Sequence, residues 1–245
     1  MGACVVRRVL AALLALSLAG CAPAPPPSQH AVAPANFPAS IYRQAAARGE
    51  PAYRIDGADS LLLIYAYRGG TLAAFGHDHV ISTRDVHGYA LIPKALAAAR
   101  ADLYFPVAAL QVDEPHWLKR AGFAQSAAVD SAGTRHHMLR DVLQARRYPY
   151  VQIHAVPLSG APPRLTLRVA LTLHGVTRTL QIPVGFTRNG RGFLVQGEFN
   201  VRQTDFGMTP YSTLGGALVV KDRLHITFRL RGERVSPAPF GSDAP

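Results

Sequence analysis

Apolar and polar residues alternate along most of the chain after Pro51. The clearest run is residues 165–174, where Leu and Val occupy one face and Thr, Arg and His the other. The same alternation recurs in residues 61–67, 180–184, 193–201 and 224–231. Period two is typical of a β-strand with one buried face, and Asn189-Gly190 between two runs predicts a hairpin. We therefore expect an all-β fold of antiparallel strands, closed into a barrel so that no edges stay exposed.

Two segments depart from this alternation. Residues 134–147 carry Met138, Leu139, Val142 and Leu143 at helical spacing, and Tyr148-Pro149 ends the pattern. Residues 37–48 predict a second short helix that ends at Gly49. We expect one or two short helices beside the barrel, with Met138 and Val142 closing one end of its interior.

The first residues have the pattern of an export signal. Arg7-Arg8 precedes a short apolar run that ends in residues 18–21 (LAGC). This run is too short to span a bilayer, and its end resembles the lipobox of bacterial lipoproteins, in which the cysteine, here Cys21, receives the lipid. Acyl chains on Cys21 would anchor the protein to a membrane at about 0.8 kcal/mol per buried methylene. Ala22 replaces the aspartate that commonly retains lipoproteins in the inner membrane, which favours the outer membrane.

These patterns divide the chain into four regions. Residues 1–20 are a signal peptide, residues 21–50 a lipidated N-terminus with a Pro/Ala-rich tether, residues 51–232 the barrel domain, and residues 233–245 a flexible tail. Of the two cysteines, Cys4 is removed with the signal and Cys21 is lipidated, so no disulfide is expected. We expect a periplasm-facing lipoprotein of the cell envelope.

The charge and the motifs of the sequence argue against several classes of function. The net charge of +11 comes mostly from scattered arginines, and export argues against nucleic acid as a partner. The chain has no G-x-S-x-G elbow, no H-E-x-x-H and no glycine-rich phosphate loop, so we expect no enzyme. The sequence leaves open whether the protein forms a homodimer.

Four segments, taken in order, resemble the YceI-like family of polyisoprenoid-binding proteins. Residues 171–178 (LTLHGVTR) look like its hairpin, and residues 53–60 like its opening strand. Residues 138–149 resemble its helix and the strand after it, and residues 202–208 its R-x-x-D-F-G element. The resemblance covers about residues 51–231. It implies a lipocalin-like antiparallel barrel of about eight strands that holds an isoprenoid or quinone tail in an elongated apolar cavity, with no required cofactor.

Side chains at odd and even positions of a strand point to opposite faces, and this parity selects the residues that we expect to face the cavity. A one-residue error in parity would turn a whole set outward. Together with Met138 and Val142 of the helix, the predicted ligand-binding residues are Leu63, Tyr65, Leu167, Val169, Leu171, Phe193, Val195, Ile226 and Phe228.

A second group of candidate residues is the run Gly76-His77-Asp78-His79. In an extended chain His77 and His79 share one face, within reach of one metal ion, with His136, His137 or His154 as a third ligand. Such histidines are more often solvated or hydrogen-bonded, and the run departs from the family's glycine-phenylalanine element, so no metal is expected. Two alternatives to lipid binding stay open: a metal- or redox-linked envelope protein that uses these histidines, and a structural module whose barrel is filled by its own side chains.

Overall fold

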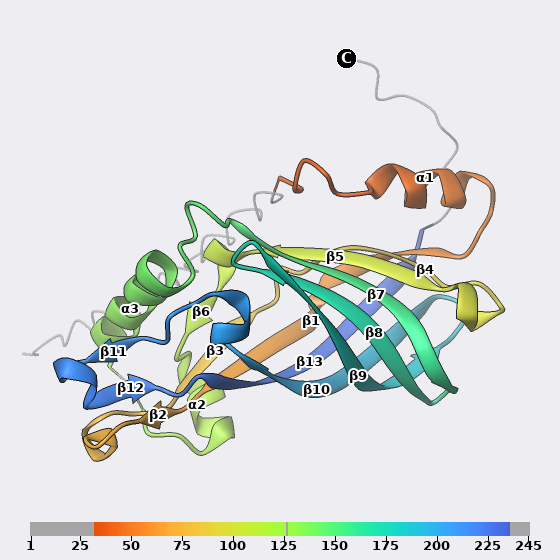
Figure 1. Cartoon of the computed structure of the whole chain (residues 1–245). Helices are drawn as coiled ribbons and strands as arrows, with labels where there is room; N and C mark the ends of the chain where they lie inside the picture. Colours follow the sequence, from red (N-terminus) through yellow and green to blue (C-terminus); the bar gives the residue numbers. More distant parts are fainter. Residues whose placement is uncertain (1–31, 126, 236–245) are drawn as a thin grey trace, which may run out of the picture. The chain divides into compact units, whose positions relative to one another are not determined.

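The alternating segments form strands that close into an antiparallel barrel (Figure 1). The computed structural model describes residues 32–125 and 127–235. The predicted signal peptide, Cys21, much of the predicted tether and the end of the tail lie outside these residues. Around the barrel the order is β1-β4-β5-β7-β8-β9-β10-β13, and β13 pairs back with β1. The eight strands are β1 (Ala52–Ala66), β4 (His87–Leu91), β5 (Arg100–Pro106), β7 (Tyr150–Ala161), β8 (Arg164–Leu173), β9 (Val176–Arg188), β10 (Gly192–Arg202) and β13 (Arg223–Arg234).

The prediction of an all-β, lipocalin-like barrel is confirmed. Short strands extend it: β3 (His79–Thr83) pairs with the second half of β1, β6 (Gln111–Val112) pairs with β3, and β2 (Arg68–Gly69), β11 (Ser212–Thr213) and β12 (Leu218–Val220) form a small separate sheet. The described residues also form three short α-helices, which are α1 (Ala39–Ala47), α2 (Pro115–Ala121) and α3 (Ala128–His137). A π-helical turn, η4 (Met138–Val142), continues α3. The short turns η1 (Ala73–Phe75), η2 (Leu96–Ala98), η3 (Val107–Ala109), η5 (Thr204–Phe206) and η6 (Leu214–Gly216) lie in connecting segments.

A bulge in β1 decides which of its side chains face inward. The β1–β13 register shifts between Asp56 and Leu61, and the Ser60 hydroxyl fills the break by accepting the Arg231 N–H at 3.1 Å and donating to the Asp56 carbonyl at 2.6 Å. Before the bulge the odd-numbered Tyr53 and Ile55 are in the main core, whereas after it the even-numbered residues of β1 are. The extra residues therefore invert the parity of the strand.

Helix α2 covers the outside of the barrel beside this part of β1. Trp117 and Leu118 of α2 pack on Leu63 and Val80 in a second hydrophobic cluster, separate from the main core. The sequence pattern did not predict α2, because this helix is shorter than two turns and starts at Pro115. The outer surface of the barrel wall is therefore buried under α2 at this point.

The other helices lie at different places on the barrel. Tyr42 of α1 is buried against β4, and its hydroxyl donates to Asp102 of β5 at 2.5 Å. Helix α3 begins six residues before the predicted start at Thr134 and gives way to the π-turn at Met138, so the predicted helix was placed too far along the chain.

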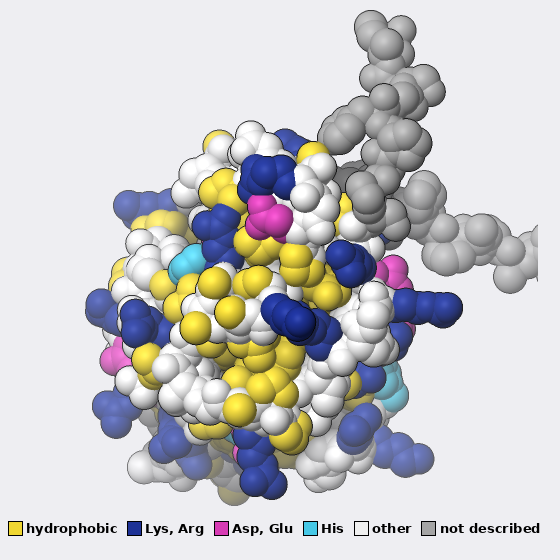
Figure 2. All heavy atoms as spheres, turned by 90° about the vertical axis from the view of Figure 1, so that its right-hand side faces the viewer, with side chains coloured by type: hydrophobic (Ala, Val, Ile, Leu, Met, Phe, Trp, Pro, Cys, Tyr) yellow, Lys and Arg dark blue, Asp and Glu magenta, His cyan; other side chains and the backbone are white. Residues whose placement is uncertain are grey.

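Charged side chains are spread over the outer surface. Figure 2 views the right-hand end of Figure 1, where apolar side chains are interspersed with many Lys and Arg and few acidic residues. This agrees with the scattered arginines of the sequence. Within the described residues, none of the helices has the length and apolar character that crossing a membrane requires.

Candidate functional site

The barrel encloses an apolar cavity of about 250 Å³ at the end where α3 and η4 lie. Strands β1, β7, β8, β10 and β13 provide its walls, and Met138 and Val142 of η4 also line it. Every lining residue is apolar except five: His79, Thr134, His137, Gln203 and Tyr211. A surface of this kind favours a hydrocarbon ligand, because burial in it returns about 25 cal/mol per Å² of apolar area.

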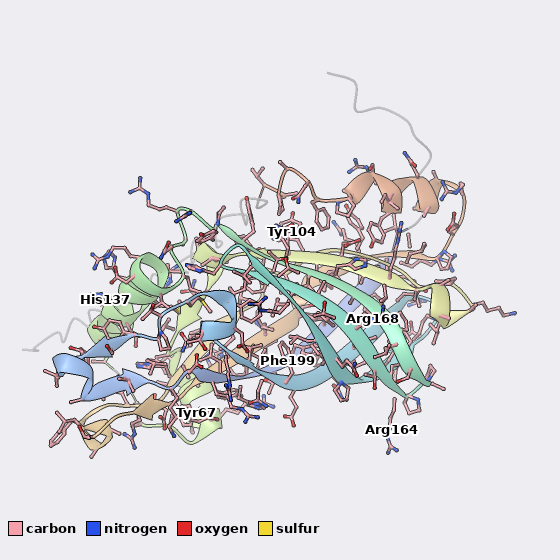
Figure 3. All side chains as sticks on the ribbon, viewed as in Figure 1. Tyr67, Tyr104, His137, Arg164, Arg168 and Phe199 are labelled. Carbon is pink, nitrogen blue, oxygen red and sulfur yellow. The ribbon has the colours of Figure 1, made fainter. Side chains whose placement is uncertain are left out.

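Polar groups of this cavity gather where α3 meets the segment before β11. The rings of His137 and Tyr211 lie 5.6 Å apart, and both side chains are partly exposed, at 45% and 38%. Figure 3 shows His137 on α3 at this end of the barrel, and Phe199 inside the barrel wall. Hydrogen bonds from Arg140 and His137 hold the pKa of Asp141 well below its usual range, which keeps it ionised beside His137. His137 and Tyr211 thus form a partly exposed polar rim of an apolar cavity.

A second, smaller cavity of about 80 Å³ lies toward the other end of the same strands. On β8, Leu165 and Leu167 line the small cavity and Leu171 and Leu173 the large one, while Val169 between them lines neither. On β10, Phe193 and Val195 line the small cavity, whereas Phe199 and Val201 line the large one. The interior is therefore hollow toward both ends, and a packed central layer lies between the two cavities.

Phe228 of β13 is part of the central layer. It stands opposite Gly197 of β10, the position between the two pairs of cavity residues. A Cβ atom at Gly197 would lie 3.0 Å from Phe228 Cζ, so the phenyl ring occupies the space that the glycine leaves open. Val169 and Leu103 pack in the same core. The elongated cavity implied by the family resemblance is thus interrupted by side chains.

Nine of the predicted cavity residues face the barrel interior. Met138, Val142, Leu171 and Ile226 line the large cavity, Leu167, Phe193 and Val195 the small one, and Val169 and Phe228 belong to the core between them. Whether any of these nine binds a ligand stays a prediction.

The predicted inward positions of Leu63 and Tyr65 are wrong. Both belong to the outer cluster under α2, and their neighbours Leu62, Ile64 and Ala66 line the large cavity instead. The cause is the bulge before Leu61, which a parity rule cannot detect.

A gap in the barrel wall separates β9 from β10 over part of their length. The two strands pair only from Phe193–Arg188 to Gly197–Val184, and a polar cleft lies beyond that point. Arg178, Arg202 and Arg223 line this cleft, and Val201, which also lines it, is shared with the large cavity. Sequence reasoning missed this cleft because the arginines come from three strands.

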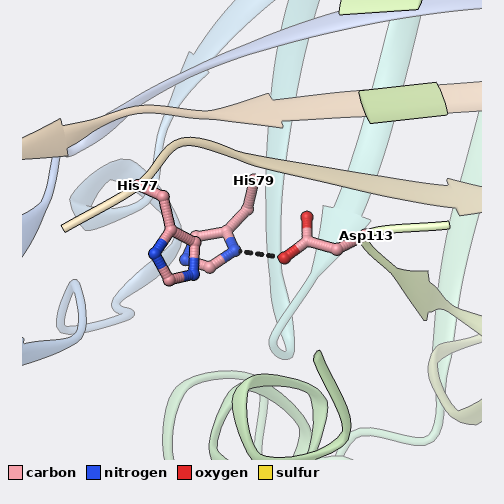
Figure 4. A group of neighbouring side chains, drawn as sticks. All are labelled: His77, His79 and Asp113. Carbon is pink, nitrogen blue, oxygen red and sulfur yellow. Dashed lines mark hydrogen bonds and ion pairs between the residues drawn. The ribbon is translucent and has the colours of Figure 1, made fainter. Parts of the chain in front are cut away.

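The histidine run lies at the wall of the large cavity. His79 lines that cavity, and its Nδ1 is 2.7 Å from Oδ2 of Asp113, whose side chain is fully buried (Figure 4). The rings of His77 and His79 are 4.8 Å apart. Donor atoms of His77, His79 and Asp113 all lie within 4.8 Å of one another. The structure thus places the two predicted histidines together.

The third group beside these histidines is Asp113, which the sequence did not single out. The expected third ligands lie elsewhere: His154 pairs with Asp102, His137 with Asp141, and His136 lies beside Arg140. Asp113 is more than thirty residues from His79 in the chain, and only the pairing of β3 with β6 brings it there.

Comparison with known proteins identifies the family of the chain. The family model of the YceI-like domain matches residues 67–231, which is more than half of the sequence. The chain belongs to the YceI-like family. The resemblance drawn from the four sequence segments is thereby confirmed, and the match lies within the barrel domain predicted from them. Among curated proteins, no relative of this YceI-like protein was found.

Several solved structures share the fold of this YceI-like protein, among them the following two. BcnA of Burkholderia cenocepacia is 15% identical with a TM-score of 0.51, and the alignment covers 72% of this chain and 98% of BcnA. A polyisoprenoid-binding domain from Saccharophagus degradans, implicated in plant cell wall breakdown, is 14% identical with a TM-score of 0.53, and the alignment covers 76% and 99% of the two chains. At these identities the likeness concerns the barrel architecture.

Proposed function

We propose that this YceI-like protein binds an amphiphilic isoprenoid lipid without converting it chemically. The isoprenoid or quinone tail occupies the large apolar cavity, and the polar head group lies at the rim formed by His137 and Tyr211. The observation that carries the proposal is the apolar lining of the cavity inside a closed barrel. Membership of the YceI-like family and the fold shared with a polyisoprenoid-binding domain support it.

The volume of the cavity limits how much of the tail it holds. The cavity, at about 250 Å³, is smaller than the roughly 300–1,000 Å³ that is usual for ligand sites, so it holds only part of a long isoprenoid tail. A longer tail reaches the small cavity only when the side chains of the central layer around Phe228 move aside.

Lipid extraction tests this proposal directly. We expect organic extracts of the purified protein to contain an isoprenoid lipid by mass spectrometry, and purified farnesol to bind to the delipidated protein. Met138→Trp places an indole in the large cavity and should abolish farnesol binding. Leu158→Trp is the matched control, because Leu158 is 37% exposed and lines neither cavity. Equal binding by the wild type and Met138→Trp, in protein that is folded by circular dichroism, would refute the site.

We also propose that the protein is a lipoprotein of the cell envelope, facing the periplasm. The support is the sequence pattern around residues 18–21 and the Pro/Ala-rich segment that follows it. Metabolic labelling with a radioactive fatty acid should mark the wild type and leave Cys21→Ser unlabelled. Labelling that persists in Cys21→Ser, or a wild type recovered in the cytoplasmic fraction, would contradict the proposal.

A further inference from the structure

We propose that His77, His79 and Asp113 bind a divalent transition-metal ion of the Zn²⁺ type at the wall of the large cavity. Their donor atoms lie within 4.8 Å of one another, and the closest pair is 2.7 Å apart. Metal bonds of about 2.0–2.1 Å at tetrahedral angles place donors roughly 3.3 Å apart. The three side chains therefore need only small rotations to share one ion. This inference rests on these residues and not on the lipid.

The backbone holds these donors in place before any ion arrives. Asp113 is clamped to β3, because its Oδ1 accepts the Val80 N–H at 2.9 Å and its own N–H donates to the Val80 carbonyl at 2.8 Å. Asp78, between the two histidines, accepts the Arg68 N–H at 2.9 Å, and the Arg68 guanidinium donates to the carbonyl of Gly76. Both ends of the site are thus fixed, which lowers the cost of ordering the ligands on binding.

Burial distinguishes Asp113 from the other carboxylates that pair with histidine. The Asp113 side chain is fully buried, whereas those of Asp102, Asp85, Asp141 and Glu198 are 16%, 37%, 40% and 73% exposed. A buried carboxylate needs compensation for its lost hydration, and here the Val80 N–H and the His79 ring supply hydrogen bonds. A divalent cation held jointly with two imidazoles would add a full positive charge beside the carboxylate.

The donor set determines the class of ion. Two imidazole nitrogens and one carboxylate oxygen suit Zn²⁺ and neighbouring first-row ions, while Ca²⁺ and Mg²⁺ prefer all-oxygen sites. Three protein ligands also leave a coordination position open. Because His79 lines the large cavity, an ion held here would lie at the wall of that cavity.

Zinc titration of the purified full-length protein tests this site. After treatment with a chelator, we expect the protein to bind one equivalent of Zn²⁺ in competition with a chromophoric indicator, and Mg²⁺ not to compete. His77→Ala, His79→Ala and Asp113→Asn should each weaken Zn²⁺ binding by at least about tenfold. His154→Ala is the matched control, since His154 pairs with Asp102 at the same 2.7 Å but has no second imidazole beside it. It should bind Zn²⁺ like the wild type.

Two results would overturn the proposal. One is a wild-type protein that takes up no stoichiometric Zn²⁺, and the other is a His77→Ala variant with unchanged affinity. His77 lies in the segment before β3, outside both hydrophobic clusters, so its replacement leaves the core intact even if Asp113→Asn fails to fold. Visible absorption of a Co²⁺-substituted protein supplies an independent readout: bands of a site with nitrogen and oxygen ligands should appear in the wild type and in His154→Ala but not in His77→Ala.

Discussion

Replacing Phe228 by alanine should join the two cavities of the barrel. The phenyl ring lies over Gly197, at the level where neither cavity has lining residues on β8 or β10. Without the ring, the large and small cavities would form one space of at least about 330 Å³, which falls within the usual range of roughly 300–1,000 Å³ for ligand sites. The variant should accept a longer isoprenoid tail than the wild type.

The Phe228→Ala variant should be less stable than the wild type. Truncation of a fully buried phenylalanine to alanine costs about 3–5 kcal/mol, and because Phe228 is only partly buried we expect a loss at or below the low end of this range. Domains have a net stability of about 5–15 kcal/mol, so we expect a folded protein with a clearly lower Tm. Phe228→Leu, which keeps part of the side chain, should lie between the wild type and Phe228→Ala in both stability and ligand length.

The expected gain in affinity depends on chain length. At about 0.8 kcal/mol per buried carbon, one further isoprene unit contributes up to about 4 kcal/mol when it is fully buried. This upper limit corresponds to nearly a thousandfold in Kd. Wild-type affinity should stop rising once the large cavity is full, whereas that of Phe228→Ala should continue to rise by at least about tenfold, a third of the upper limit.

Calorimetric titration with geraniol, farnesol and geranylgeraniol measures this dependence. Phe186→Ala is the control, because Phe186 is buried and lines the small cavity without belonging to the central layer. It should lose at least as much stability as Phe228→Ala, since Phe228 is only partly buried, and keep the wild-type dependence on chain length. If Phe228→Ala and Phe186→Ala show the same profile, or if wild-type affinity rises steadily through geranylgeraniol, the central layer is not the barrier that we infer.

Two further changes test the packing around the barrel. Tyr42→Phe should lower the free energy of unfolding by about 1.5–3 kcal/mol, since it removes a partly buried hydrogen bond to the Asp102 carboxylate. Tyr150→Phe, which removes an exposed hydrogen bond, should change it less. Burial and then the bond to Asp102 raise the pKa of Tyr42, so stability should fall as the pH rises above the ordinary tyrosine value of 10.0, and urea unfolding of Tyr42→Phe should show less of this fall. Gly197→Ala should cost about 1–3 kcal/mol by thermal denaturation, because its Cβ would lie 2.8 Å from the Pro183 carbonyl oxygen, whereas Gly190→Ala meets no atom within 4 Å and should be nearly neutral.

The barrel itself was predictable from period-two alternation. Strand β8 has the bounds Arg164–Leu173, close to the alternating run of residues 165–174, and the Asn189-Gly190 turn joins β9 to β10 as expected. In these strands no register shift interrupts the residues to which the parity rule was applied. The rule failed at β1, where the register shift before Leu61 exchanges the two faces of the strand.

The site was predictable only in part, since its residues are distant in the chain. Alternate positions place His77 and His79 on one face, but nothing near them in the sequence indicates Asp113. The central layer has the same limit: Phe228 fits an inward-facing strand position, yet only the register with Gly197 shows that it divides the interior. Contacts that depend on the pairing of distant strands carry no local signal.

The large cavity is itself a physical argument for a ligand. At about 24 cal/mol per Å³ for an enclosed cavity, an unfilled apolar space of about 250 Å³ costs at most roughly 6 kcal/mol compared with a packed core, because its rim is open to solvent. That is a large part of the stability of a domain of this size. Larger side chains at Val201 or Ala66 would reduce this cost at the cavity wall, yet both positions hold small residues. A hydrocarbon tail in the cavity would recover the missing contacts, so the same packing deficit that weakens the empty barrel provides the free energy for binding.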